Sequence, residues 1–184
     1  NDEFLTKRRK MNQELELELT FFVKRMPDEI KSVEPVRIVD IYIPDTSEHS
    51  HLRLRQKGEK FEITKKMPVV KGDASEQIEQ TIPLTKEEFI ALANCSKKRV
   101  SKDRYNISIE GKMAEIDVFT NELEGLVLMD FEFTTKEEKS AFEIPSIALA
   151  DVTQEDFIAG GLLAGKTYND IVPELERFNY KKIG

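Results

Sequence analysis

The sequence has little cysteine and no long apolar run. Its single cysteine, Cys95, excludes an internal disulfide framework, and no cysteines or histidines are spaced as zinc ligands. No run of about 18 apolar residues is present, so no membrane-spanning helix is expected. Residues Asn1 to Lys10 are polar and basic, and they lack the apolar stretch of a signal peptide. These absences predict a cytoplasmic protein.

An excess of positive charge is also absent. Acidic residues number 35 against 28 basic residues, and the net charge is −7. This balance argues against general binding to nucleic acid or to an anionic membrane surface. A chain of 184 residues is long enough for one domain with an apolar core. We therefore expect a single domain over residues 13–184, preceded by a lead-in over residues 1–12.

The most informative stretch runs from residue 14 to residue 23, where carboxylates and leucines alternate over three repeats. Alternation with a period of two predicts a β-strand with one apolar and one polar face. The polar face would carry Glu14, Glu16, Glu18 and Thr20. A solvated face is one interpretation, but three like charges repel one another and glutamate has a poor β-propensity. A bound divalent cation, which prefers oxygen ligands, is the other interpretation.

Alternation and turn signals predict seven further strands. They cover residues 36–43, 51–57, 60–66, 76–83, 98–109, 113–119 and 126–133. Glycines at positions 58 and 111 mark hairpin turns between two pairs of these strands. Eight strands with hairpin-like connections predict a closed antiparallel β-barrel, because closure leaves no free sheet edge.

Helices are expected around this barrel. Thr85 and Glu88 form a capping box ahead of an apolar stripe, which predicts a helix that ends near Asn94. Further helices are expected over residues 135–142, 154–164 (capped by Thr153) and 168–178, with a linker over residues 144–149. The predicted fold class is therefore α+β, mainly β: an eight-stranded antiparallel barrel with peripheral helices.

Charges of opposite sign lie on different strands. Acidic side chains alternate over residues 14–18 and 130–132, whereas basic side chains alternate over residues 53–55 and 102–104. In an ordinary barrel these would be solvated outer faces joined by weak cross-strand ion pairs. If they face inward instead, the interior is a polyanion site with metal ligands on one part. Periodicity does not distinguish the two orientations.

Short motifs follow one another in a characteristic order. They are Glu16-Leu17-Glu18, Arg53-Leu54-Arg55, Ile63-Thr64-Lys65-Lys66, Glu76-Gln77-Ile78-Glu79, Lys102-Asp103-Arg104-Tyr105, Ile116-Asp117-Val118-Phe119 and Asp130-Phe131-Glu132. In these motifs and their spacing, the chain resembles the CYTH domain, or triphosphate tunnel metalloenzyme, family over about residues 14–153. Each motif alone is weak, but the shared order is specific.

The resemblance implies an eight-stranded tunnel with a charged interior that binds a triphosphate. The residues implied for the phosphates are Arg53, Arg55, Lys66, Lys102 and Arg104. The residues implied for Mg²⁺ or Mn²⁺ are Glu16, Glu18, Asp130 and Glu132, with Asp117 and Glu79 as further ligands. Guanidinium groups suit phosphate oxygens, and carboxylates suit a hard cation that offsets charge in phosphoryl transfer.

The main departure from the family pattern is Thr20. The family has a lysine there, which in some triphosphatases is associated with positioning or activating the attacking water. A threonine hydroxyl can form a hydrogen bond but contributes no charge. Glu16, Glu18 and Thr20 are the residues expected at the reacting centre, and Thr20 leaves full, slow or absent turnover open.

The favoured function is a divalent-metal-dependent triphosphatase acting on tripolyphosphate, since nothing in the sequence resembles a pocket for a base or a thiazole. A class IV adenylate cyclase, which uses ATP, and a thiamine triphosphatase are the alternatives among enzymes. A catalytically weak module that binds polyphosphate or nucleotides is the alternative of another class. The expected partner is thus a triphosphate compound, and a homodimer is left open by the sequence.

Overall fold

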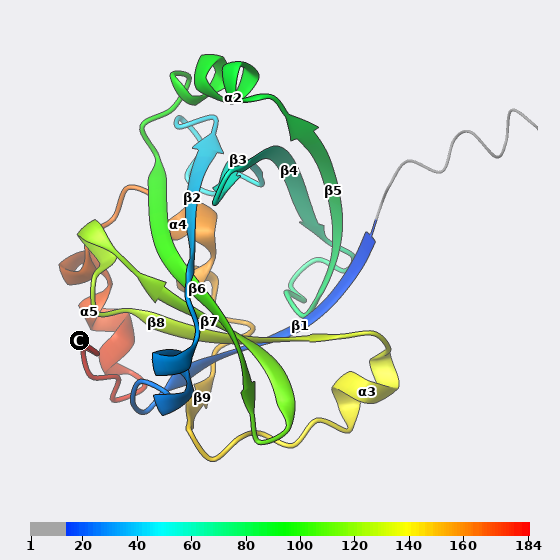
Figure 1. Cartoon of the computed structure of the whole chain (residues 1–184), viewed down its shortest axis with the longest axis vertical. Coiled ribbons are helices and arrows are strands. Elements are labelled where there is room, and N and C mark those ends of the chain that lie inside the picture. Colours follow the sequence, from blue (N-terminus) through cyan, green and yellow to red (C-terminus); the bar gives the residue numbers. More distant parts are fainter. Residues whose placement is uncertain (1–13) are drawn as a thin grey trace, which may run out of the picture.

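The computed structural model describes residues 14–184, and the lead-in over residues 1–12 lies outside the described residues. Eight antiparallel strands form a closed barrel (Figure 1). They are β1 (Glu14–Val23), β2 (Val36–Ile43), β3 (Leu52–Lys57), β4 (Lys60–Pro68), β5 (Glu76–Leu84), β6 (Arg99–Ile109), β7 (Lys112–Phe119) and β8 (Val127–Phe133). The order around the barrel is β5-β4-β3-β2-β6-β7-β8-β1, and β1 pairs with β5. The predicted closed eight-stranded barrel is confirmed.

Strand β1 closes the barrel because it pairs with different strands along its length. Its first part pairs with β5, from Glu14 opposite Glu79 onward. Its second part pairs with β8, as far as Phe22 opposite Leu128. Its end also pairs with a short ninth strand, β9 (Ala148–Asp151). The prediction of a linker over residues 144–149 is therefore wrong in its last two residues, which belong to β9. A strand of four residues is too short for alternation to indicate it in the sequence.

The apolar faces of β1, β7 and β8 point out of the barrel and pack beneath the surrounding segments. Phe21, Ile116 and Met129 are fully buried in one cluster on this outer side, together with Phe142 from the segment that follows β8. A 3₁₀ turn at Asp28–Ser32 covers part of the same cluster. Since alternating residues of a strand point to opposite faces, the charged positions of these strands point into the barrel.

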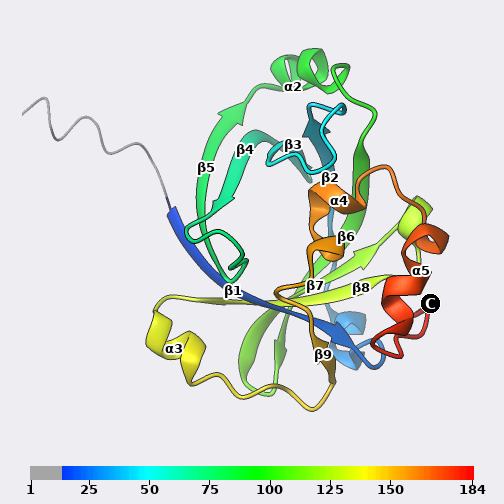
Figure 2. The ribbon, with the colours of Figure 1, turned by 180° about the vertical axis from the view of Figure 1, so that it is seen from behind.

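At one end of the barrel the inward positions become apolar. Tyr42, Val100, Phe119 and Leu128 form a cluster with side chains of the short helix α4 (Gly160–Leu163) and of α5 (Tyr168–Glu176). Figure 2 shows α4 lying across this end of the barrel. The charged interior is therefore bounded on this side by an apolar floor.

The helices only partly follow the sequence prediction. Helix α2 (Lys86–Ala93) begins at the predicted capping box, and Phe89 packs on Phe61 of β4 with a ring distance of 5.0 Å. Helix α3 (Lys136–Ser140) ends earlier than expected, at residue 140. Helix α5 also stops short of its expected end, at residue 176. None of the helices within residues 14–184 has the length and apolar character needed to cross a membrane.

The continuous helix predicted over residues 154–164 is wrong. The structure has a 3₁₀ turn at Asp156–Ile158 followed by the four-residue helix α4. The hydroxyl group of Thr153, the predicted cap, instead accepts a hydrogen bond from the backbone N–H of Thr20 at 3.0 Å. It also donates to Oδ1 of Asp151 at 2.6 Å. Tertiary hydrogen bonds thus occupy the hydroxyl that the local pattern assigned to capping.

Candidate functional site

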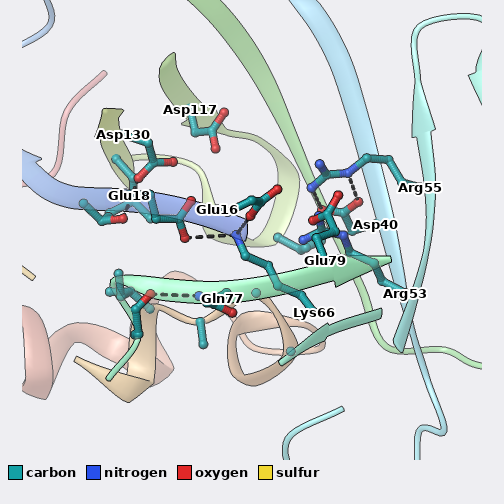
Figure 3. A pocket seen from close by; sticks show the side chains of 18 of the residues that line it. Glu16, Glu18, Asp40, Arg53, Arg55, Lys66, Gln77, Glu79, Asp117 and Asp130 are labelled. Carbon is teal, nitrogen blue, oxygen red and sulfur yellow. Dashed lines mark hydrogen bonds and ion pairs between the residues drawn. The ribbon is translucent and has the colours of Figure 1, made fainter. Parts of the chain in front are cut away.

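A cavity of about 950 Å³ lies inside the barrel. Every residue that the sequence assigned to a site lines it, and Figure 3 shows several of their side chains converging. They are Glu16, Glu18, Thr20, Arg53, Arg55, Lys66, Glu79, Lys102, Arg104, Asp117, Asp130 and Glu132. The structure thus decides between the two orientations that periodicity left open, because the charged faces turn inward.

Carboxylates from neighbouring strands face one another on one wall of the cavity. Glu18 of β1 lies directly opposite Glu132 of β8, and Thr20 lies opposite Asp130. The hydroxyl group of Thr20 donates a hydrogen bond to Oδ1 of Asp130 at 2.7 Å. We call the carboxylates of Glu16, Glu18, Asp130 and Glu132 the acidic wall.

Burial and mutual repulsion oppose ionisation of Asp130 and Glu132 in the acidic wall. Burial and the carboxylates of Asp117 and Glu18 raise the pKa of Asp130 to about 7. Burial and the neighbouring carboxylate of Glu115 likewise raise the pKa of Glu132. Raised pKa values of this kind mean that the carboxylates resist ionising together unless a cation joins them.

Lys66 of β4 supplies one cation to this wall. Its Nζ atom lies 2.5 Å from Oε2 of Glu16 and 3.0 Å from Oε1 of Glu18. The contact with Glu16 is an ion pair without a well-directed hydrogen bond, so this buried oxygen keeps an unused acceptor site. Burial opposes the charge of Lys66, but Glu18 and Glu16 outweigh it and raise the pKa of its ammonium group.

A basic wall faces the acidic one, with side chains from β3 and β6. Arg53 contacts Glu79 of β5 at 3.4 Å, whereas its Nε atom is buried and has no hydrogen-bond partner among the described residues. A buried donor without a partner is unfavourable in the free protein, and an anionic ligand would satisfy it. The basic wall, defined as Arg53, Arg55, Lys102 and Arg104, therefore has a donor available for a phosphate oxygen.

Arg104 and Lys102 of β6 share the carboxylate of Asp117. Arg104 donates from Nε to Oδ1 at 2.6 Å and from Nη2 to Oδ2 at 2.7 Å, and Lys102 also contacts Oδ2. Burial alone would raise the pKa of Asp117, but the two cations lower it well below its usual range. Burial lowers the pKa of Lys102, and nearby Arg104 adds to this effect, although Asp117 opposes it. The carboxylate of Asp117 is thus occupied by two cations of the basic wall.

Asp40, a buried carboxylate on β2, is not among the site residues predicted from the sequence. It accepts hydrogen bonds from Nε and Nη2 of Arg55 at 2.7 and 2.8 Å (Figure 3). Burial alone would raise the pKa of Asp40, but the Arg55 guanidinium lowers it to about 2. A signal was present in the sequence, since Asp40 is an isolated acid between Ile38 and Tyr42 on an otherwise apolar face of the strand.

The acidic wall has the chemistry of a site for a hard divalent cation. It offers carboxylate oxygens from two adjacent strands, and a bound cation would offset the burial and repulsion that raise the pKa of Asp130. Within residues 14–184, no group of three acidic, histidine or cysteine side chains already surrounds a point where an ion could sit. The ammonium group of Lys66 lies between two of the carboxylates, so ion binding would require these side chains to rearrange.

Comparison with known proteins agrees with this geometry. A scan against models of protein families finds no match. An inorganic triphosphatase of Nitrosomonas europaea is 30% identical over 141 residues, which cover 76% of this chain and 90% of the relative. The chain belongs to the CYTH, or triphosphate tunnel, family. A crystal structure of an inorganic triphosphatase superposes on this CYTH protein with a TM-score of 0.59 and 27% identity, covering 81% of this chain and 93% of the other.

A structure from Bacillus halodurans shares the CYTH fold at a lower level of similarity. It is 20% identical, has a TM-score of 0.50 and covers 92% of this chain and 100% of the other. At this identity the likeness supports the fold alone. In this CYTH protein, a basic wall and an acidic wall face one cavity, so a polyanion and a cation can be held between them.

Proposed function

We propose that the protein hydrolyses a phosphoric anhydride bond of inorganic tripolyphosphate with the help of Mg²⁺ or Mn²⁺. The observation that carries the proposal is the pair of oppositely charged walls inside one cavity. The relationship to an inorganic triphosphatase supports the choice of substrate. In the reaction, water attacks the terminal phosphorus atom, the bond to the bridging oxygen breaks, and phosphate and pyrophosphate are formed.

The basic wall would bind and orient the phosphate groups. The unpartnered Nε of Arg53 would take a phosphate oxygen directly. Arg55 uses one edge of its guanidinium for Asp40, which leaves its Nη1 for the substrate. Arg104 holds Asp117 through Nε and Nη2, and its Nη1 forms an ion pair with Glu115. Lys102 and Lys66 would add positive charge where negative charge develops in phosphoryl transfer.

The acidic wall would hold the divalent cation through Glu16, Glu18, Asp130 and Glu132. When bound, the cation would neutralise charge on the substrate oxygens. Glu79 and Asp117, the further ligands that the sequence predicted, are engaged by Arg53 and by the cations of β6. Their ligand role stays a prediction, and the geometry favours a role as counter-ions of the basic wall.

Thr20 would act through Asp130. Its hydroxyl donates a hydrogen bond to Oδ1 of Asp130 and so uses one lone pair of this oxygen. Oδ2 of Asp130 remains available to bind the cation or water. Because this hydroxyl carries no charge, a module that binds triphosphates without turning them over is the second candidate function. The hydrogen bond to Asp130 is the observation behind that candidate, since it leaves Thr20 without a free donor for water.

The deciding experiment measures phosphate release from tripolyphosphate, ATP and thiamine triphosphate with Mg²⁺, with Mn²⁺ and with a chelator. The proposal expects release from tripolyphosphate that needs a divalent cation and is lost in Arg53→Gln. Formation of cyclic AMP from ATP would indicate a cyclase instead. Binding of tripolyphosphate without release, unchanged by Thr20→Lys, would indicate the module and refute the hydrolase.

A further inference from the structure

Asp40 occupies an unusual place, because it is a carboxylate inside the basic wall. It lies on β2, opposite Arg55 of β3 and between that strand and β6. Only 2% of its surface is exposed, and it lines the same cavity as the residues proposed to bind phosphate. Its partner Arg55 is 9% exposed, so the pair is almost wholly removed from water.

The contact between Asp40 and Arg55 has the geometry that a phosphate would use. Both carboxylate oxygens accept hydrogen bonds from one edge of the guanidinium, at 2.7 and 2.8 Å. Two parallel N–H···O bonds are also how arginine binds a phosphate group. One edge of Arg55 that could bind a phosphate is therefore already filled by an anion that belongs to the chain.

An internal anion of this kind lowers the gain from binding an external one. In the free protein the buried guanidinium is compensated, so a phosphate adds little to it unless it displaces or shares with Asp40. Arg53 is different, because its buried Nε has no partner among the described residues. A phosphate oxygen would therefore give this atom a new hydrogen bond without displacing another anion. The two arginines of one motif thus differ in what they can contribute to affinity.

We propose that Asp40 is an affinity-setting residue that competes with phosphate for Arg55. This inference rests on the proposed function, because it takes the ligand of the cavity to be a phosphate chain. It assigns Asp40 the role of keeping short phosphate chains, such as the pyrophosphate product, from being held too tightly. Removal of the carboxylate leaves an uncompensated cation in the free protein, so binding of a polyanion becomes more favourable.

The test is the affinity for pyrophosphate in the presence of Mg²⁺, measured by calorimetry for the wild type and for Asp40→Asn. Tightening by about tenfold is expected, the effect of one charge-assisted hydrogen bond. Asp103→Asn is a matched control, because Asp103 forms the same two contacts with Arg37 on the outer surface, at 2.6 and 3.0 Å. Affinity that is unchanged or weaker in Asp40→Asn overturns the proposal.

A double variant shows whether the tightening acts through Arg55. Asp40→Asn combined with Arg55→Gln removes both charges, which proteins tolerate better than the loss of one partner. Its affinity should not exceed that of the wild type, and tightening that persists in it would contradict the role given to Arg55. If Asp40→Asn alone does not fold, pyrophosphate with Mg²⁺ should restore its folded circular dichroism spectrum, and failure to do so overturns the proposal.

The outcomes also separate this proposal from the proposed function. If the wild type hydrolyses tripolyphosphate but Asp40→Asn does not bind pyrophosphate more tightly, only the role given to Asp40 is refuted. A wild type that neither binds pyrophosphate nor hydrolyses tripolyphosphate refutes both. A purely structural role for Asp40 would lower the melting temperature of the free protein without enlarging the stabilisation that pyrophosphate provides.

Discussion

The ammonium group of Lys66 lies 2.5 Å from Oε2 of Glu16 and reaches Glu18 as well. The chain thereby places its own cation among the carboxylates proposed to hold a divalent ion. Since two cations cannot occupy one position, binding of the ion must move Lys66 away from these carboxylates. Lys66 would then be free to turn towards the substrate, which would link the two binding events.

Replacement of Lys66 tests this exchange. We expect Lys66→Met to bind Mn²⁺ several-fold more tightly without a polyanion, because a competing positive charge of about one unit is removed. The same variant should bind tripolyphosphate more weakly. Electron paramagnetic resonance of free Mn²⁺ measures the first effect, and Lys65→Met, exposed on the same strand, is the control. Weaker Mn²⁺ binding in Lys66→Met would contradict the exchange.

The raised pKa of Asp130 predicts how stability depends on pH. Its value in the fold is about 7 against an ordinary 3.8, so the folded state binds more protons than the unfolded state in this interval. Its contribution to stability is therefore largest at low pH and is lost as the pH rises through 7. Without divalent cations, the free energy of unfolding should fall by about 1 kcal/mol between pH 6 and pH 8.

Urea unfolding at several pH values measures this loss. His49, whose lowered pKa works in the opposite direction, contributes to the same profile. Comparison with Asp130→Asn isolates the carboxylate, because His49 is common to both proteins. Any decline in unfolding free energy with rising pH that is larger in the wild type than in Asp130→Asn is due to Asp130. Equal pH profiles for the two proteins would contradict the raised pKa assigned to Asp130.

The hydroxyl of Thr20 is expected to stabilise the ionised form of Asp130. Thr20→Val removes the 2.7 Å hydrogen bond without a large change in volume, and a loss of about 1 kcal/mol in unfolding free energy is expected at pH 8. The pH at which stability declines should move upward, because the pKa of Asp130 rises further. Thr20→Ser keeps the donor and should follow the wild type in the same urea experiment.

Asp117 is expected to be the carboxylate whose loss most harms the fold. It is fully buried and accepts hydrogen bonds from Arg104 and Lys102. Asp117→Asn leaves these two cations without their shared counter-ion, and a loss of about 3–5 kcal/mol is expected for breaking such a buried pair. Thermal unfolding measures the effect. The outer pair variant Asp103→Asn should change stability by less than about 1 kcal/mol, since exposed ion pairs contribute little.

The contact between α4 and the barrel depends on Gly160. A methyl group at this position would collide with Oη of Tyr42. We expect Gly160→Ala to destabilise the protein by about 1–3 kcal/mol through overpacking. The double variant Gly160→Ala/Tyr42→Phe should recover part of this loss because it removes the colliding oxygen. Equal melting temperatures for the two variants would show that the collision is relieved in another way.

The sequence predicted those features that depend on local alternation. Glu14 to Val23 could be recognised as a strand because carboxylates and leucines alternate over its first three repeats, and the Thr85 capping box located a helix within one residue. Features that depend on partners far along the chain were not predictable. Whether Thr153 caps a helix or bonds to Thr20 depends on a neighbour 133 residues away.

The site was predictable in composition but not in pairing. Family motifs indicated which charged residues line the cavity, yet no motif includes Asp40. The pairing of Asp40 with Arg55 requires the register between β2 and β3 and the inward direction of both side chains. Likewise, the carboxylate of Asp117 is engaged by Arg104 because these residues face each other across β6 and β7.

The double pairing of β1 has a consequence for biosynthesis. Glu14 pairs with Glu79 and Phe22 pairs with Leu128, so the first of the eight barrel strands to be synthesised is among the last to find its neighbours. Contacts so distant in sequence slow folding, and until then both edges of the unfinished sheet are exposed to other chains. An ion or a phosphate chain that joins the two walls would favour the closed barrel and protect the newly made protein from aggregation.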